Sequence, residues 1–481
     1  MPQKETPAGL GRRTSVILYG VLLVLGVGGF LLVRQLGHDL LAPPPASGAA
    51  TFGEPSDLKH VDVLMHVLLA LAVVIITARA VGALFSRLHQ PAVIGEVLAG
   101  ILLGPSLLGR VAPEVSAFLL PTSVAPSLQI LSQVGVIIYM FLVGLELDLD
   151  IVKQRSHATI AISHASIVMP FLMGATLALA LYPRVSSSDV PFTPFALFCG
   201  VSMSVTAFPV LARILTDRGQ HRTRLGVITL TCAAVDDVTA WCLLAFVVSV
   251  VHTRVGGALL TAGLSVAYIT GMLLVARPLL GRLVVAQETR PGLAKNALAL
   301  IFVGLLLSAL ITDAIGIHAV FGAFVLGAVI PHRSRVAREL IARLEDVVVV
   351  LLLPAFFAYT GMRTQIGLVS SVEQWLLCGL IIVVASAGKF GGSLAAARLT
   401  GLGWREAASV GVLMNTRGLM ELIVLNIGLD LRVISPTLFA MLVIMALVTT
   451  FATTPILHAL SPGSDTPEAE PTEPPLLPTA G

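Results

Sequence analysis

The chain carries about 14 apolar runs, each close to the roughly 20 residues that a bilayer-spanning helix needs. Only 12% of its residues are charged, against about 25% in a typical soluble domain. A soluble protein of this length could bury a core without such a composition. The sequence therefore predicts an all-α membrane protein with about 13–14 transmembrane helices. The runs begin near Ser15, Val61, Pro91, Ser127, Ala158, Thr193, Leu225, Leu259, Ala297, Ile317, Val347, Trp375, Ala407 and Thr437.

Lysine and arginine residues alternate between connections where they cluster and connections where they stand singly. Cytoplasmic connections of membrane proteins carry the excess of these residues. If the N-terminus is cytoplasmic, every second connection is a rich one, which supports the helix count and places both termini inside. Clusters contain, among others, Arg79, Arg87, Arg213, Arg218, Arg282, Arg290, Arg335, Arg338, Arg398 and Arg405, whereas Lys59, Arg110, Arg184, Arg254, Arg363 and Arg432 stand singly.

We expect three segments along the chain. Residues 1–55 form an extra N-terminal transmembrane helix and loop, in which Arg12 and Arg13 precede an apolar stretch. A cleaved signal peptide is the alternative, but the stretch is longer than a usual signal core, which favours a retained anchor. Residues 56–460 form the main transmembrane domain. Residues 461–481 are rich in Pro, Glu and Thr and are expected to be a disordered tail.

Two apolar runs are interrupted near mid-depth by hydrogen-bonding residues that weaken a helix. The sixth run contains SVTAFP at 204–209, and the thirteenth contains NTRG at 415–418. An odd number of steps separates the two runs, so they cross the bilayer in opposite directions, as an inverted-topology repeat requires. Interrupted helices at matching positions of two halves point to a transporter's binding site. The alternative is a proline kink at Pro209 and a separate polar packing patch. The candidate residues are Ser204, Pro209, Asn415, Thr416 and Arg417.

Charged residues occur in the middle of two other runs. Asp236 and Asp237 are adjacent in the seventh run, and Lys389 lies in the twelfth. A charge at the bilayer centre costs on the order of 3 kcal/mol or more, so such residues are functional by default. Neighbours on a helix point about 100° apart, so one aspartate can face an ion cavity while the other contacts Lys389 as counter-charge. The alternatives are a misplaced helix end for the aspartates and a snorkelling lysine.

Arg417 and Glu421 are four residues apart and share one helix face. We expect them to form an internal ion pair that braces the second broken helix, which is a structural role rather than a transport role. The four cysteines all lie in apolar runs without a CxxC pair, so neither a disulfide framework nor a zinc site is expected. No cofactor is predicted, and no basic patch with aromatic residues indicates nucleic acid as a partner.

Several separate motifs, in order along residues 61–460, resemble the monovalent cation:proton antiporter-2 family, in its bacterial and plant cation/proton exchanger branch. They are QPAVIGE at 90–96, GILLGPS at 100–106, FLVGLEL at 141–147, DDVTAW at 236–241, GIHAVFGAF at 316–324 and NTRGLMEL at 415–422. The potassium-efflux branch has a similar transport unit but usually adds a C-terminal nucleotide-binding domain, and the short segment after residue 460 leads us to expect the exchanger branch instead.

The resemblance implies a sodium/proton antiporter-type fold, in which two broken helices cross within a mobile core, and a homodimer. It implies that Asp237 binds the ion, that Asp236 pairs with Lys389, and that Thr206 contributes an ion-facing hydroxyl or carbonyl. In the family, an Asp–Asp pair tends to accompany electrogenic exchange. We therefore expect a multi-pass protein of the bacterial inner membrane.

The predicted function is exchange of Na⁺ or K⁺ for H⁺ by alternating access, with both ions competing for the buried aspartates. The closest alternative is a potassium-efflux-type cation channel or transporter, although a channel needs a continuous pore and usually symmetric subunits. An enzyme is not expected. An intramembrane protease normally needs aspartates on two separate helices, and a prenyltransferase needs carboxylates one helical turn apart. The expected partners are the two ions, membrane lipid and a second copy of the chain.

Overall fold

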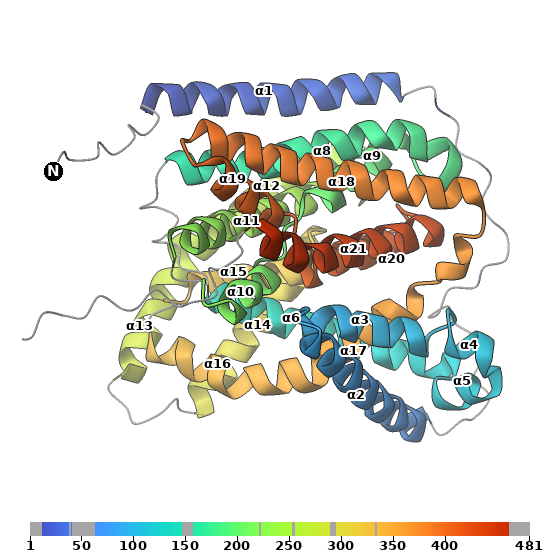
Figure 1. Ribbon diagram of the computed structural model, residues 1–481. Helices are drawn as coiled ribbons and strands as arrows, with labels where there is room; N and C mark the ends of the chain where they lie inside the picture. The colour runs from blue at the N-terminus through green and yellow to red at the C-terminus, as the bar shows by residue number, and fades with distance from the viewer. Residues whose placement is uncertain are drawn as a thin grey trace, which may run out of the picture.

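The computed structural model describes residues 12–37, 40, 63–146, 157–220, 223–252, 255–288, 295–331 and 334–460. Every element in these ranges is a helix, which confirms the predicted all-α class (Figure 1). Within the part of the chain that the structure describes, ten helices are long and apolar enough to cross a membrane, or eleven if one bent pair counts as a single span. The predicted tail at 461–481 and the loop at 41–62 lie outside the described residues.

The predicted count of helices is higher than this number for a physical reason. Two of the predicted runs form helices of 11 residues, α15 (Ala319–Val329) and α17 (Leu353–Arg363). Of α1 (Arg12–Leu36), the count takes in only the part Val24–Leu36. A π-helical turn at Val348–Leu352 joins α17 to the charged helix α16 (Arg335–Val347). Hydropathy alone therefore counts some short apolar helices as complete membrane spans. These helices are long enough to cross a membrane only together with the polar residues or the turn next to them.

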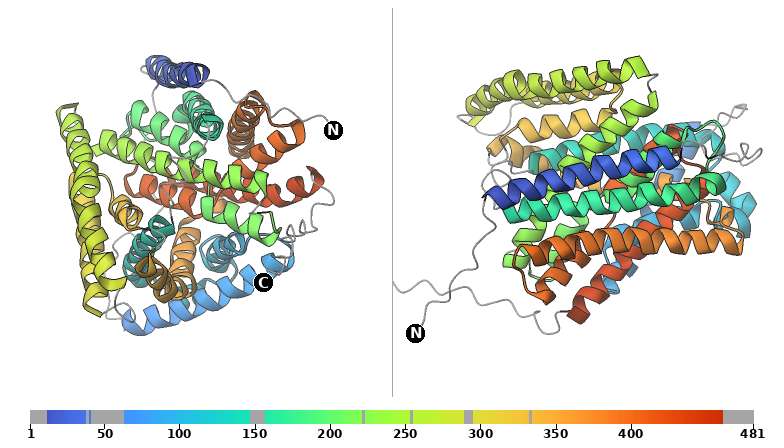
Figure 2. Two further views of the ribbon diagram at one scale, coloured as in Figure 1. Left: turned by 90° about the vertical axis from the view of Figure 1, so that its left-hand side faces the viewer. Right: turned by 90° about the horizontal axis from the view of Figure 1, so that it is seen from above.

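The helices form two packed groups, seen toward the bottom and the top of Figure 1, with α15 of the lower group and α10 of the upper group near the middle. The lower group, called the α3 group, contains α2 (Val63–Arg87), α3 (Ala92–Leu103), α6 (Ala125–Glu146), α14 (Lys295–Ile315), α15 and α17. The upper group, called the α8 group, contains α8 (His157–Val185), α9 (Phe192–Ser204), α10 (Phe208–Asp217), α11 (Arg224–His252), α18 (Val372–Leu399), α19 (Trp404–Met414), α20 (Leu419–Asp430) and α21 (Pro436–Leu460). Two views at right angles show the same bundle from its end and from above (Figure 2).

The remaining helices connect or cover these groups. α12 (Val255–Gly271) and α13 (Arg277–Glu288) follow each other through a π-helical turn at Met272–Ala276. Two short helices, α4 (Leu108–Val111) and α5 (Pro113–Leu119), and a 3-10 turn at Thr122–Val124 link α3 to α6, and a second 3-10 turn, Ile366–Leu368, follows α17. The N-terminal helix α1 lies along α8, where the rings of Phe30 and Phe171 are 5.9 Å apart.

Both predicted interruptions are breaks in a helix, and the two breaks meet. The first separates α9 from α10 at 205–207, and the second separates α19 from α20 with a bend of 42°. The backbone N–H of Ala207 donates to the carbonyl of Thr416 at 3.0 Å, so the crossing of the two broken helices is confirmed. Pro209 lies in the first turn of α10, where a helix has no need of the missing N–H. Pro209 thus helps to start a new helix, and the alternative of a simple proline kink is wrong.

Candidate ion-binding site

Asp236 on α11 is surrounded by hydrogen-bond donors. Its Oδ1 accepts from the hydroxyl of Ser163 at 2.5 Å, and its Oδ2 lies 2.6 Å from Ser166 Oγ and 2.8 Å from Thr206 Oγ1. The ammonium of Lys389 lies 3.0 Å from the same Oδ2. Asp236 and Lys389 are both fully buried. A buried carboxylate keeps its charge only when it is paired and hydrogen-bonded in this way, so Asp236 fits the role of a fixed anion.

Close packing of α18 on α8 places these donors around Asp236. Gly388 faces Pro170, and a Cβ at Gly388 would lie only 2.8 Å from the Pro170 Cα. The absence of a side chain therefore lets the two helices touch, and the next residue, Lys389, reaches the carboxylate. Lys389 Nζ also donates to the carbonyl of Ser204 at 2.5 Å, which ties α18 to the end of α9.

Asp237 has a very different environment, although it is the next residue. It is 3% exposed, and its Oδ1 has no hydrogen-bond partner among the described residues. The backbone N–H of Phe208, at the start of α10, lies near its carboxylate. The N-terminus of a helix attracts negative charge, so α10 favours an anion or the ligand of a cation at this point. One carboxylate oxygen of Asp237 can therefore still accept a ligand, whereas both carboxylate oxygens of Asp236 already have hydrogen-bond donors.

Arg417 connects the second break to the first. Its guanidinium donates to the carbonyls of Ser202 at 2.9 Å and Met203 at 2.8 Å, and it lies 2.9 Å from a carboxylate oxygen of Glu421. The last carbonyls of a helix lack partners within that helix, and basic side chains there also oppose the negative end of the helix dipole. Arg417 therefore caps α9 from the opposite broken helix, in addition to its contact with Glu421.

The remaining predicted residues lie at the two breaks. Ser204 Oγ donates to the carbonyl of Gly200 at 2.7 Å, and Thr416 Oγ1 donates to that of Leu413 at 2.5 Å. Asn415 Oδ1 is buried and has no partner among the described residues. The structure places the Thr206 hydroxyl on Asp236, whereas the family resemblance implied an ion-facing position for this residue.

Ser163 and Ser166 are site residues that the sequence analysis missed. They lie three residues apart on α8, which is about one helical turn, and both hydroxyls reach Asp236. The available signal was the occurrence of two hydroxyl residues at helical spacing within an apolar run. Serine is common in membrane helices as a packing residue, so this signal has little weight without knowledge of the neighbouring helix.

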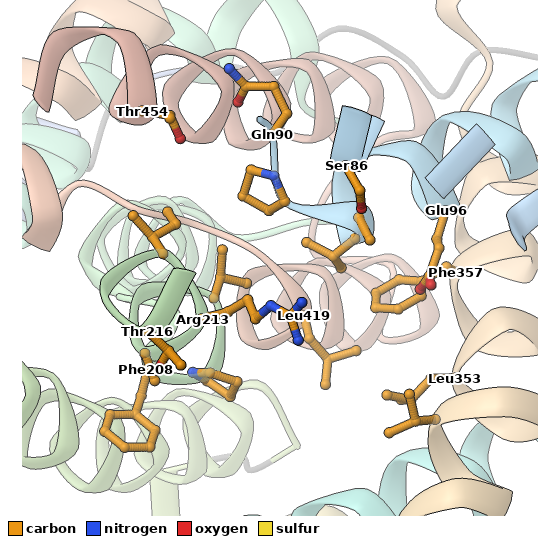
Figure 3. A pocket seen from close by; sticks show the side chains of 18 of the residues that line it. Ser86, Gln90, Glu96, Phe208, Arg213, Thr216, Leu353, Phe357, Leu419 and Thr454 are labelled. Carbon is orange, nitrogen blue, oxygen red and sulfur yellow. The ribbon is translucent and has the colours of Figure 1, made fainter. Parts of the chain in front are cut away.

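A cavity of about 1650 Å³ opens between the two helix groups on one side of the site (Figure 3). Glu96 and Leu353 lie on one wall, and Phe208 and Arg213 lie on the other. Phe208 lines the cavity and its backbone N–H lies near Asp237, which is not among the lining residues, so the start of α10 separates the open space from the aspartate. Charged residues of both signs line the cavity, namely Arg79, Glu96, Glu146, Arg213, Arg218 and Glu345.

Comparison with known proteins gives a consistent result. A family model described as the transmembrane sodium/hydrogen exchanger matches residues 66–460. Na(+)/H(+) antiporter NhaS4 of Synechocystis sp. is 43% identical over 403 residues, which cover 83% of this chain and 98% of that protein. Cation/H(+) antiporter 20 of Arabidopsis thaliana is 39% identical over 405 residues, which cover 81% of this chain but 48% of the plant protein. This chain thus spans nearly all of the cyanobacterial relative and about half the length of the plant relative.

A solved structure has the same fold. The sodium proton antiporter MjNhaP1 from Methanocaldococcus jannaschii, in a structure at pH 8, superposes with a TM-score of 0.53 at 15% sequence identity. The superposition covers 82% of this chain and 97% of that chain. At this identity the likeness bears on the architecture alone, and it supports the antiporter-type arrangement of the helices.

Proposed function

Because the chain belongs to the sodium/hydrogen exchanger family, we propose that it exchanges Na⁺ or K⁺ for H⁺ across a membrane, with Asp237 as the group for which the two ions compete. Both similar proteins are named as antiporters of a cation and H⁺. The family predicts the class of reaction, and the geometry at the two breaks supports the choice of residue.

The contrast between the two aspartates carries the proposal. Asp236 has partners for both of its oxygens, whereas Asp237 Oδ1 is buried and no residue that the structure describes hydrogen-bonds to it. A dehydrated alkali cation needs oxygen ligands, and a carboxylate supplies oxygen together with charge. A proton competes for the same oxygen. Asp236 and Lys389 then serve as a fixed pair that leaves Asp237 as the exchanging group.

Coupling follows from the cost of an empty site. A bare Asp237 carboxylate that changed sides would be a buried unpaired charge, which costs several kcal/mol. With a proton or a cation bound, that charge is neutralised, and reorientation becomes easy. Transport of one ion therefore requires return with the other. The cavity brings water from one side as far as the start of α10, which separates it from Asp237.

We extend the proposal to the setting of the protein. A single exchanging carboxylate moves one proton for each monovalent cation and therefore no net charge. The exchange is electrogenic when Lys389, which contacts Asp236, also releases a proton as the cation binds and takes one up as it leaves. The protein is a homodimer in the bacterial inner membrane with both termini cytoplasmic. Residues 56–460 form the exchanger unit. Residues 1–55 provide a retained anchor, which the packing of α1 on α8 supports. The cavity side is cytoplasmic, because Arg79, Arg213 and Arg218 line it.

Everted vesicles with an acridine dye test the central claim. Addition of Na⁺ or K⁺ to respiring vesicles dequenches the dye when cation entry drives protons out. We expect this signal with the unmodified protein and with Asp313→Asn, which alters an exposed aspartate, and no signal with Asp237→Asn. Normal dequenching in Asp237→Asn would refute the proposal. Current measurements with reconstituted protein test electrogenicity, and an imposed proton gradient that drives cation flux distinguishes an exchanger from a channel.

A further inference from the structure

A second cluster of buried polar side chains joins α17 to α20 where both helices end. Arg363 Nη1 donates to Asn426 Oδ1 at 3.0 Å, and Arg363 Nη2 lies 2.7 Å from Asp430 Oδ1. Asn426 Nδ2 in turn donates to Thr360 Oγ1 at 2.7 Å. We call these four residues the Arg363 latch. Arg363 is 6% exposed, whereas the side chain of Asp430 is 38% exposed, so the cluster reaches from the interior to one face of the protein.

The latch lies at the opposite end of the two helices from the cavity. Leu353 and Phe357 on α17 and Leu419 on α20 line the cavity (Figure 3). Arg363 and Asp430 are the last residues of the same two helices, which places them about 15 Å further along at 1.5 Å per residue. The pair of helices is therefore apart at one end and tied together at the other.

Each side of the latch is fixed to a different helix group. A Cβ on Gly361 would lie 2.5 Å from the backbone of Gly100, so α17 is held against α3. α20 is held to α9 through Arg417, which caps the carbonyls of Ser202 and Met203. The Arg363 latch therefore joins the α3 group to the α8 group, which contains the aspartates.

We propose that Arg363, Asn426 and Asp430 form a gate that closes the ion site to the face opposite the cavity and that separates when this face opens. The inference rests on the proposed exchange function, since an exchanger must open its site to each side in turn. The planar fork of Arg363 contacts Asn426 and Asp430 together, which a lysine ammonium cannot reproduce. When Arg363 and Asp430 separate, water solvates the Asp430 carboxylate. The ion pair therefore stabilises the closed gate, but the free-energy cost of opening the gate stays small enough for the cycle.

Hydrogen–deuterium exchange of the purified full chain tests this gate. Asp430→Asn and Arg363→Gln each weaken the latch, and the partial exposure of Asp430 makes its conservative replacement compatible with folding. The matched control is Glu373→Gln, which removes the exposed contact between Arg184 and Glu373 within the α8 group. Melting temperatures in the same detergent verify that each variant is folded.

We expect a coordinated change at both ends of the molecule. Deuterium uptake should rise roughly threefold or more at 357–366 and 422–431 in both latch variants, and it should fall at 86–96 and 208–217 as the cavity closes. Glu373→Gln should change none of these segments. Faster exchange at the latch without slower exchange at the cavity would show only local fraying and would overturn the proposal, as would no change at either end.

Hydrogen–deuterium exchange also tests the gate proposal independently of the proposal that Asp237 is the ion site. In an Asp237→Asn background the latch variants should show the same opposite changes at the two ends, even though exchange activity is lost. If transport by Asp237→Asn turned out to be normal, the ion-site proposal would fail while the gate result would stand. A latch response that vanished in this background would contradict a gate built from Arg363, Asn426 and Asp430.

Discussion

The two sides of α11 that carry Asp236 and Asp237 differ in what reaches the carboxylate. On one side, three hydroxyls and the Lys389 ammonium lie within 3.0 Å of Asp236. On the other, one oxygen of Asp237 has no partner among the described residues. Identical side chains thus acquire different roles from their neighbours. The Asp236 side should determine stability, and the Asp237 side should determine transport.

The largest effect on stability is expected for Lys389→Ala. Removal of this ammonium leaves the Asp236 charge buried without its counter-charge, which typically costs ~3–5 kcal/mol. Thermal unfolding in detergent should show a large fall in melting temperature. Lys295→Ala, at an exposed lysine, is the matched control and should change little. An unchanged melting temperature in Lys389→Ala would contradict the pairing with Asp236.

Ser163→Ala should have the next largest effect. The Ser163 hydroxyl is the donor to Asp236 Oδ1, and its loss leaves a buried charged oxygen unsatisfied, at ~1–3 kcal/mol. The control is Thr176→Ala on the same helix, because that hydroxyl is exposed and contacts only its own backbone. Equal stability of the two variants would mean that Ser163 does not hold Asp236.

Thr206→Val should destabilise the protein less than Ser163→Ala. The Thr206 hydroxyl is shared between Asp236 Oδ2 at 2.8 Å and the carbonyl of Met414 at 3.3 Å, and Oδ2 keeps other donors. We expect a loss of ~0.5–1.5 kcal/mol. Measurement of the apparent KM for the cation sharpens the comparison. A much larger change in KM than in stability would assign Thr206 to the ion instead of to Asp236.

Asp237→Asn should have the smallest effect on stability. One oxygen of Asp237 has no donor among the residues that the structure describes, so a neutral amide of the same shape should leave the free energy of unfolding within ~0.5 kcal/mol or raise it. Asp237→Asn should therefore have a normal melting temperature but give no exchange signal in the vesicle assay. A fall in stability as large as that of Lys389→Ala would make Asp237 a structural residue and remove the contrast.

The sequence was sufficient to predict the broken helices because their signals are local. Pro209 and the polar residues at 415–418 interrupt apolar runs, and unwound backbone at membrane depth is tolerated only inside protein or beside water. The adjacent aspartates stand out for the same reason, since charge in an apolar run is costly. These features depend on the residues themselves and on the membrane.

Features that depend on helix rotation and contact could not be predicted in this way. Ser163 and Ser166 matter only because α8 turns them toward α11, and Gly388 because α18 meets Pro170. The capping of α9 by Arg417 joins residues more than 200 positions apart. The sequence indicated the contact of Arg417 with Glu421, which is one turn away, but gave no sign of the distant one. Hydropathy likewise overestimated the full spans at α15 and α17.

The position of α1 has a consequence for the surrounding lipid. This helix lies on α8, on the side turned away from the α3 group (Figure 1), and it exposes Leu31 and Leu32 outward. Any displacement of the α8 group moves α1 as well. The lipid acyl chains that contact α1 must then rearrange in every transport cycle. Bilayer viscosity then becomes part of the resistance to transport, and stiff, ordered lipid should slow the cycle even when the ion site is unchanged.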